Sequence, residues 1–235
     1  MTPLKTYLEL CRISNLPTVW TNVLAAAVLS GAGLSIGSYL PLALAMSCFY
    51  MAGMCFNDVC DREIDRLTQA RRPLPSGRIS LRRAIGLTCA LFGLGLGLLG
   101  LSPHPLALAA GLLLVGTIVF YDLHHKGNPF SVLVMAACRL LVFVVTALAL
   151  SGQLNTWVLL AGGAQFGYVV LISLVARHEN QSARRFAFPV IPAMLAGISL
   201  LDGLLLAGLV GWPWLGCGVA GAALTWLAQR YVRGD

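Results

Sequence analysis

Apolar runs long enough to cross a lipid bilayer recur along the whole chain, and they restrict it to one class of fold. Hydrophobic residues make up 58% of the 235 residues, and charged residues make up 11%. A helix of about 20 residues spans the hydrocarbon core, and within lipid a helix satisfies its own backbone hydrogen bonds. We therefore predict an all-α membrane protein with a single domain over residues 1–235. The eight predicted spans lie near residues 16–36, 39–57, 83–102, 105–122, 130–151, 155–176, 187–208 and 211–231.

The placement of basic residues predicts the orientation of these spans. With the N-terminus in the cytoplasm, the turns on the outer side contain no Lys or Arg. The residues that fall inside are Lys5, Arg12, the arginines of 62–83, Lys126, Arg177, Arg184, Arg185, Arg230 and Arg233. This asymmetry indicates a multi-pass protein with both termini and the functional loops in the cytoplasm. The net charge of +7 then reflects topology and contact with the lipid bilayer, and no nucleic-acid-binding motif is present. We expect residues 3–14 to form an amphipathic helix on the membrane surface.

An acidic cluster follows the second predicted span. At helical pitch, Asn57, Asp58, Asp61 and Asp65 fall on one face of a helix. Like charges at this spacing destabilise a helix unless cations lie among them. Carboxylate and amide oxygens suit a hard cation, and Mg²⁺ prefers a few carboxylates together with phosphates of a substrate. The spacing therefore predicts a site for Mg²⁺ and a phosphate at the membrane surface.

A basic turn comes directly after the acidic helix, in the sequence Arg-Arg-Pro-Leu-Pro-Ser-Gly-Arg-Ile-Ser over residues 71–80. Its prolines, serine and glycine indicate a tight turn, and Ser80 is expected to cap the next helix. Arg71, Arg72 and Arg78 could hold diphosphate oxygens next to the metal. The alternative is that these arginines only anchor the turn to anionic lipid.

The acidic pattern Asn-Asp-x-x-Asp-x-x-x-Asp and this basic turn together resemble the first signature of the UbiA superfamily of intramembrane prenyltransferases, and the chain is most similar to its EboC-like branch. The resemblance implies a helical bundle around a central cavity. It also implies Mg²⁺ held by Asn57, Asp58, Asp61 and Asp65 and bridged to a polyprenyl diphosphate, with Arg72 on the diphosphate.

Two further segments are compared with that family. Tyr121 to Lys126 occupies the position of a family motif that ends in Lys-Arg, so that His125 and Lys126 replace the basic pair. Lys126 is expected to contact the diphosphate. His125 either helps it or is an interfacial residue without a role. Where the family places a second acidic motif, this chain offers Glu179 as a single carboxylate. Either Glu179 binds a second metal ion, or Arg177 replaces its charge.

The predicted activity is transfer of a prenyl group from an allylic diphosphate to a small aromatic, cyclitol or other polar acceptor, with release of pyrophosphate. Arg139 lies within a span, where it either binds substrate or pairs with an acidic neighbour such as Asp122. We expect a structural or acceptor-pocket role for Asp202. The residues predicted to act in catalysis are Asp61, Asp65, Tyr121 and Lys126. Those predicted to bind diphosphate are Arg71, Arg72, Arg78, His125, Lys126 and Arg139. Two alternatives are a non-catalytic membrane scaffold or carrier with the same fold, and a phosphotransferase.

Overall fold

The computed structural model describes residues 3–181 and 188–232, and within these ranges it contains helices and no strand. The predicted all-α class is confirmed. The helices are α1 (Pro3–Leu10), η1 (Ile13–Asn15), α2 (Leu16–Leu29), α3 (Ile36–Thr68), α4 (Leu81–Leu99), α5 (Pro105–His124), α6 (Ser131–Ser151), α7 (Thr156–Gln181), α8 (Val190–Leu209), η2 (Trp212–Trp214) and α9 (Leu215–Ala228).

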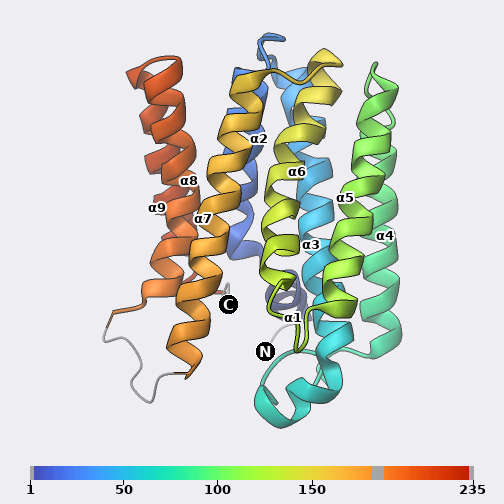
Figure 1. Ribbon diagram of the computed structural model, residues 1–235. Helices are drawn as coiled ribbons and strands as arrows, with labels where there is room; N and C mark the ends of the chain where they lie inside the picture. The colour runs from blue at the N-terminus through green and yellow to red at the C-terminus, as the bar shows by residue number, and fades with distance from the viewer. Residues whose placement is uncertain (1–2, 182–187, 233–235) are drawn as a thin grey trace.

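The helices form one upright bundle, with α8 and α9 at one edge and α4 and α5 at the other (Figure 1). Consecutive helices pack as antiparallel neighbours, and α2 lies in the interior against α3, α6, α8 and α9. Its residues Val19 and Val23 belong to the largest apolar core, together with Met46 and Phe49 of α3 and Leu114 of α5. The interior is therefore built where α2, α3, α5 and α6 meet.

Each of the eight predicted spans falls on one of the helices α2 to α9, although the helices differ in length. Six of the described helices are long and apolar enough to cross a membrane. The other two, α2 and α9, have 14 residues each. At 1.5 Å per residue they extend about 21 Å, which is less than the hydrocarbon thickness. The count of eight is thus approximate, and the protein is an integral membrane protein with multiple passes.

The acidic cluster lies on a helix, as its spacing predicted. That helix is continuous with the second predicted span, because α3 runs without a break from Ile36 to Thr68, over 33 residues. Its final turns project below the rest of the bundle (Figure 1). The predicted cap is confirmed, because the Ser80 side chain accepts a hydrogen bond from the backbone N–H of Arg83 at the start of α4.

The N-terminal segment contains the predicted helix, α1, and packs partly against the protein, while Leu4 is exposed. Its position on the membrane surface stays a prediction. Leu10 and Cys11 are buried in a small core with Cys55 of α3 and with Leu74 and Ile79 of the turn that follows it. Arg78 Nη1 forms an ion pair with Glu9 Oε2, and the two atoms are 2.6 Å apart. The segment therefore packs against α3 and the turn that follows it at the lower end of the bundle.

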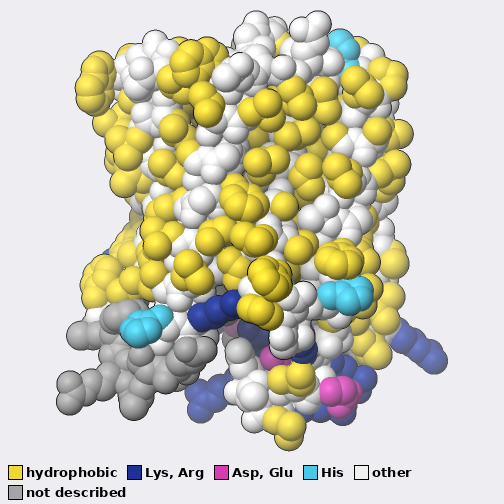
Figure 2. All heavy atoms as spheres, in the orientation of Figure 1, with side chains coloured by type: hydrophobic (Ala, Val, Ile, Leu, Met, Phe, Trp, Pro, Cys, Tyr) yellow, Lys and Arg dark blue, Asp and Glu magenta, His cyan; other side chains and the backbone are white. Residues whose placement is uncertain are grey.

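Charged side chains gather at the same end of the molecule. In the face shown in Figure 2, an apolar surface covers the upper part, and Lys, Arg, Asp and Glu side chains lie below it. This agrees with the predicted segregation of basic residues, whereas the cytoplasmic orientation stays a prediction. Arg184, Arg185 and Arg233, which contributed to that prediction, lie outside the described residues.

Candidate active site

The carboxylates of α3 form a buried face. Asp58, Asp61 and Asp65 are 2%, 9% and 4% exposed, whereas the Glu63 side chain between them is 71% exposed. A helix places residues three and four apart on the same side, which explains the difference. Asn57 is half-buried one turn above Asp61. The predicted common face is therefore present, and it points into the protein.

Basic side chains from distant parts of the chain lie among these carboxylates. Arg72 Nη1 lies 2.7 Å from Asp65 Oδ2 and 3.5 Å from Asp58 Oδ1. Lys126 Nζ lies 2.7 Å from Asp61 Oδ1, and His125 Nε2 lies 3.4 Å from the same oxygen. The repulsion expected within the acidic face is thus offset by groups from the basic turn and from the end of α5.

Arg12 is a member of this site that the sequence did not reveal, because its charge was used only to predict topology. Its Nη2 donates to Asp58 Oδ1 at 3.2 Å, and its Nη1 lies 3.6 Å from Met54 Sδ. Arg12 adopts a left-handed conformation (φ 44°, ψ 49°), and among the described residues it alone does so without being glycine. Such a conformation costs about 1 kcal/mol or more, so the surrounding structure holds Arg12 in place.

The other two predicted arginines of the turn differ from Arg72. Arg78 pairs with Glu9 and also donates to Ser76 Oγ and to the backbone carbonyl of Arg71. These contacts fasten the turn to α1. The Arg71 side chain is exposed. A diphosphate contact by Arg71 or Arg78 stays a prediction.

The end of α5 forms a second wall of the site. Asn57 Nδ2 donates to Asp122 Oδ1 at 3.1 Å, and Tyr121 stacks on His125 with ring centroids 5.0 Å apart. Asp122 is 4% exposed, and its Oδ2 has no hydrogen-bond partner in the described part of the chain. Sequence reasoning considered Asp122 only as a partner for Arg139. Its position next to Tyr121 was the available signal that it belongs to the site.

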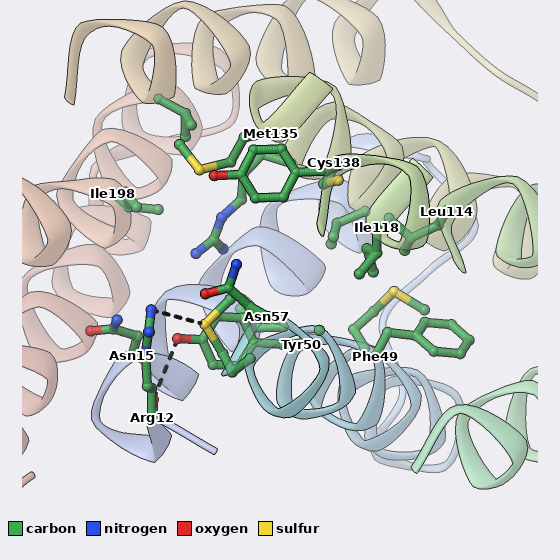
Figure 3. A pocket seen from close by; sticks show the side chains of 18 of the residues that line it. Arg12, Asn15, Phe49, Tyr50, Asn57, Leu114, Ile118, Met135, Cys138 and Ile198 are labelled. Atoms are coloured by element: carbon green, nitrogen blue, oxygen red, sulfur yellow. Dashed lines mark hydrogen bonds between the residues drawn. The ribbon is translucent and has the colours of Figure 1, made fainter. Parts of the chain in front are cut away.

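A cavity of about 260 Å³ opens beside Asn57, Tyr121 and Asp122. One part of its lining is apolar and includes Met46, Phe49, Leu114, Ile118 and Val142. We call this part the apolar arm. The other part, which we call the polar arm, contains Arg12, Asn15, Tyr50 and Arg139 together with apolar residues such as Met54 and Ile198. In Figure 3, Arg12 and Asn15 lie on one side of Asn57, and Phe49, Leu114 and Ile118 lie on the other. The cavity therefore offers two chemically different surfaces next to the acidic face.

Arg139 does not form the suggested pair with Asp122. Its Nη1 donates to Asn22 Oδ1 at 2.6 Å and its Nη2 to Thr18 Oγ1 at 2.9 Å, both on α2. Asn22 in turn donates to Asp202 Oδ2 at 2.7 Å. The correct partners could not be read from spacing, because α2 and α6 are brought together only by tertiary packing.

Comparison with known proteins identifies the family. The sequence pattern of the UbiA prenyltransferase family matches residues 16–235. The chain belongs to this family. It is 29% identical over 249 residues to digeranylgeranylglyceryl phosphate synthase of Methanopyrus kandleri, a match that covers 96% of this chain and 88% of that one. The synthase of Saccharolobus solfataricus is 33% identical over 150 residues, which cover 60% of this chain and half of the relative.

Solved structures with the same fold agree with this assignment. A digeranylgeranylglyceryl phosphate synthase structure superposes with a TM-score of 0.64 at 19% identity, covering 99% of this chain and 96% of that one. A UbiA homologue from Archaeoglobus fulgidus bound to DMAPP and Mg²⁺ gives 0.59 at 15% identity, covering 95% and 98%. At these identities the likeness establishes the shared fold. The predicted superfamily and enzyme class are confirmed, and the EboC-like branch stays a prediction.

Where UbiA proteins carry a second acidic motif, residues 173–181 of this chain contain one carboxylate, Glu179. Glu179 is half-buried near the end of α7, and no described residue forms a hydrogen bond or ion pair with it. Arg177 Nη2 lies 3.4 Å from Ser131 Oγ at the start of α6. Within residues 3–181 and 188–232, no three His, Cys, Asp or Glu side chains converge as metal ligands. Metal binding by Glu179 therefore stays a prediction.

Proposed function

We propose that this UbiA-family protein is a Mg²⁺-dependent prenyltransferase that moves an allylic prenyl group from a polyprenyl diphosphate to a polar acceptor and releases pyrophosphate. The observation that carries this proposal is the buried carboxylate face of α3, which is ringed by Arg12, Arg72 and Lys126 and whose Asn57 lines the adjacent cavity. An Archaeoglobus fulgidus homologue of the same fold was solved with DMAPP and Mg²⁺, which supports the choice of donor and metal.

The residues fit Mg²⁺ by their donor chemistry. Mg²⁺ is a hard cation and prefers oxygen ligands. Carboxylate or amide oxygens are available from Asn57, Asp58, Asp61 and Asp65. The buried and unpartnered Oδ2 of Asp122 next to Asn57 adds another oxygen that lacks a donor. Among the described residues these carboxylates do not converge on one point but pair with Arg12, Arg72 and Lys126. We infer that they would hold the metal together with the diphosphate, which would take over these cations. When bound, Mg²⁺ would stabilise the negative charge that develops on the leaving pyrophosphate.

The cationic side chains would bind the rest of the diphosphate. Arg72 and Lys126 already lie within 3 Å of the carboxylates, so a diphosphate held at the α3 face would meet both of them. As the bond between the prenyl C1 and the diphosphate oxygen breaks, the electron pair leaves with pyrophosphate, and preorganised cations lower the energy of that charge. In the net reaction the acceptor bonds to C1, and its proton passes to pyrophosphate.

The cavity would protect the allylic cation from water. The prenyl tail fits the apolar arm, where Phe49, Leu114 and Ile118 exclude solvent. Tyr121 lines the cavity beside Asp122 and can present its ring to the cation. Stacking on His125 fixes the orientation of that ring. Tyr121 would therefore stabilise the cation through the face of its ring.

An assay of purified protein tests the function directly. The protein in lipid nanodiscs is incubated with geranyl diphosphate, Mg²⁺ and a panel of acceptors that includes a prenylglyceryl phosphate, aromatic hydroxy acids and cyclitols. Pyrophosphate release and a labelled product that both require Mg²⁺ are expected. If geranyl diphosphate shows no Mg²⁺-dependent binding, the protein is a scaffold or carrier and the proposal is wrong.

Lys126→Met should lower kcat/KM for the donor by about 10–100-fold, because a charge-assisted contact with the diphosphate is lost. His124→Gln provides the matched control. His124 is exposed two residues away and stacks on Phe120, outside the carboxylate face. Steady-state kinetics with varied geranyl diphosphate would measure both variants. Equal activity of the two variants would contradict a diphosphate contact by Lys126.

Phe49→Leu should shift donor preference toward longer prenyl chains, because Phe49 is fully buried at the wall of the apolar arm. We expect the ratio of kcat/KM for farnesyl over geranyl diphosphate to rise about tenfold, as for a pocket enlarged by one or two methylene groups. Phe92→Leu is the control, since its ring lies 6.5 Å from that of Phe49 but does not line the cavity. An unchanged ratio in Phe49→Leu would place the tail elsewhere.

A further inference from the structure

Arg139 is a charged residue deep within the bundle. It lies eight residues after the start of α6, which corresponds to about 12 Å along the helix axis. A charge at such depth is costly and normally faces a partner or a cavity. Arg139 has both, because it contacts α2 and lines the polar arm. Of the five N–H groups of its guanidinium, two have acceptors in the described part of the chain. The others are available to a ligand.

A buried set of polar residues holds this guanidinium in one orientation. Thr18 and Asn22, which accept its two hydrogen bonds, are both fully buried. Asn22 links Arg139 to Asp202, and Gln165 donates to the other carboxylate oxygen of Asp202 at 2.7 Å. Asp202 is 1% exposed. Because Asn22 stands between the two charges, Asp202 balances Arg139 without occupying the edge of the guanidinium that faces the cavity.

The neighbours of Arg139 make the polar arm unlike the rest of the cavity. Arg12 and Asn15 line this arm, and Tyr50 also contributes, with its hydroxyl donating to the Arg12 carbonyl at 3.4 Å. The side chains on the other side of Asn57 are apolar (Figure 3). An apolar prenyl tail gains nothing from fixed cations and amides, whereas an oxyanion forms strong charge-assisted hydrogen bonds with them. The two arms are therefore suited to different substrates.

We propose that the polar arm is the acceptor site, and that Arg139 binds a phosphate or carboxylate group of the acceptor. This inference rests on the proposed prenyl transfer and replaces the predicted contact of Arg139 with the diphosphate. The donor then lies on the α3 face with its tail in the apolar arm, and the acceptor enters from the side of α2. The nucleophile of the acceptor meets the prenyl C1 between the arms, near Asn57 and Tyr121.

Matched acceptors test the proposal on the wild-type protein. One pair is a prenylglyceryl phosphate and the same prenylglycerol without phosphate, and the other is an aromatic hydroxy acid and the phenol without its carboxylate. With geranyl diphosphate and Mg²⁺, at least one anionic member should be prenylated with a kcat/KM about 10–100-fold above that of its neutral partner. The pair that shows this preference distinguishes a phosphate from a carboxylate. Equal use of both members of every pair would overturn the proposal.

Substitution of Arg139 separates acceptor binding from donor binding. Arg139→Met should abolish the preference for the anionic acceptor, while the affinity for geranyl diphosphate, measured by calorimetry, stays within about twofold of wild type. Arg139→Lys should restore part of the preference. Arg83→Met, at an exposed position at the start of α4, is the control for loss of a positive charge. If Arg139→Met does not fold, the wild-type comparison still decides.

Two results would contradict the assignment in different ways. In Arg139→Met, the affinity for geranyl diphosphate could fall by the same factor as kcat/KM for the anionic acceptor. That result would show that Arg139 binds the diphosphate. If wild-type protein does not bind geranyl diphosphate with Mg²⁺ at all, prenyl transfer fails and the acceptor site fails with it. The donor-binding measurement distinguishes these two cases.

Discussion

Asp61→Asn is expected to lower Mg²⁺-dependent prenyl transfer by about 100-fold or more. Asp61 is buried at the centre of the carboxylate face and lies within reach of both Lys126 and His125. The substitution removes one negative charge from the proposed metal site and leaves Lys126 without its counter-ion. The positions of the metal and of the diphosphate are therefore both disturbed. Initial rates at several Mg²⁺ concentrations would show the loss in kcat and a weaker dependence on the metal.

Glu63→Gln is the matched control for this substitution. Glu63 lies on the same helix, but its exposed side chain pairs with Arg62 and Arg66 on the outer face. Exposed pairs of this kind contribute little, so activity should stay close to wild type. Transfer that survives unchanged in Asp61→Asn would remove the metal site from the α3 face.

Gly218→Val should destabilise the protein strongly without touching the active site. A Cβ atom at Gly218 would lie 2.6 Å from the Cα atom of Gly203, so α8 and α9 pack with their backbones in direct contact. Because backbone atoms on both sides cannot move aside as a side chain can, the helices must separate. Overpacking of this kind costs about 3 kcal/mol. The thermal midpoint of the purified protein in detergent is expected to fall by about 10 °C.

Gly216→Val serves as the comparison on the same helix. No atom lies within 4 Å of a Cβ built at Gly216, so the added side chain meets open space. The two substitutions introduce the same residue two positions apart, and only the packing differs. Equal midpoints for both variants would show that close contact between α8 and α9 does not contribute to stability.

Hydropathy predicts most of this fold because a long apolar run in lipid favours a helix. Each apolar run became a helix, since a helix satisfies its backbone hydrogen bonds within its own segment. Local sequence is less informative where the chain leaves the apolar core. Spacing predicted the acidic helix and the helix at residues 3–14, but it did not predict the contacts between distant residues that hold them, such as Arg78 with Glu9.

The candidate site was predictable in part for a similar reason. The spacing of Asn57, Asp58, Asp61 and Asp65 is a local property of one helix, and the structure keeps these residues on one buried face. Arg12 and Asp122 were missed as members of the site. A cation near a membrane surface is usually explained by topology, and a carboxylate at a helix end usually meets water. Only the packing of the N-terminal segment and of α5 against α3 brings these two side chains to the cavity.

The backbone conformation of Arg12 creates a conflict between stability and chemistry at one position. Glycine adopts the left-handed region at no steric cost, so Gly at position 12 would relax the turn between α1 and η1. The same change would remove the guanidinium that contacts Asp58 and lines the polar arm. Selection for stability alone would therefore favour replacement of Arg12 by Gly, which removes an active-site side chain. Residue 12 should be held fixed in any such selection.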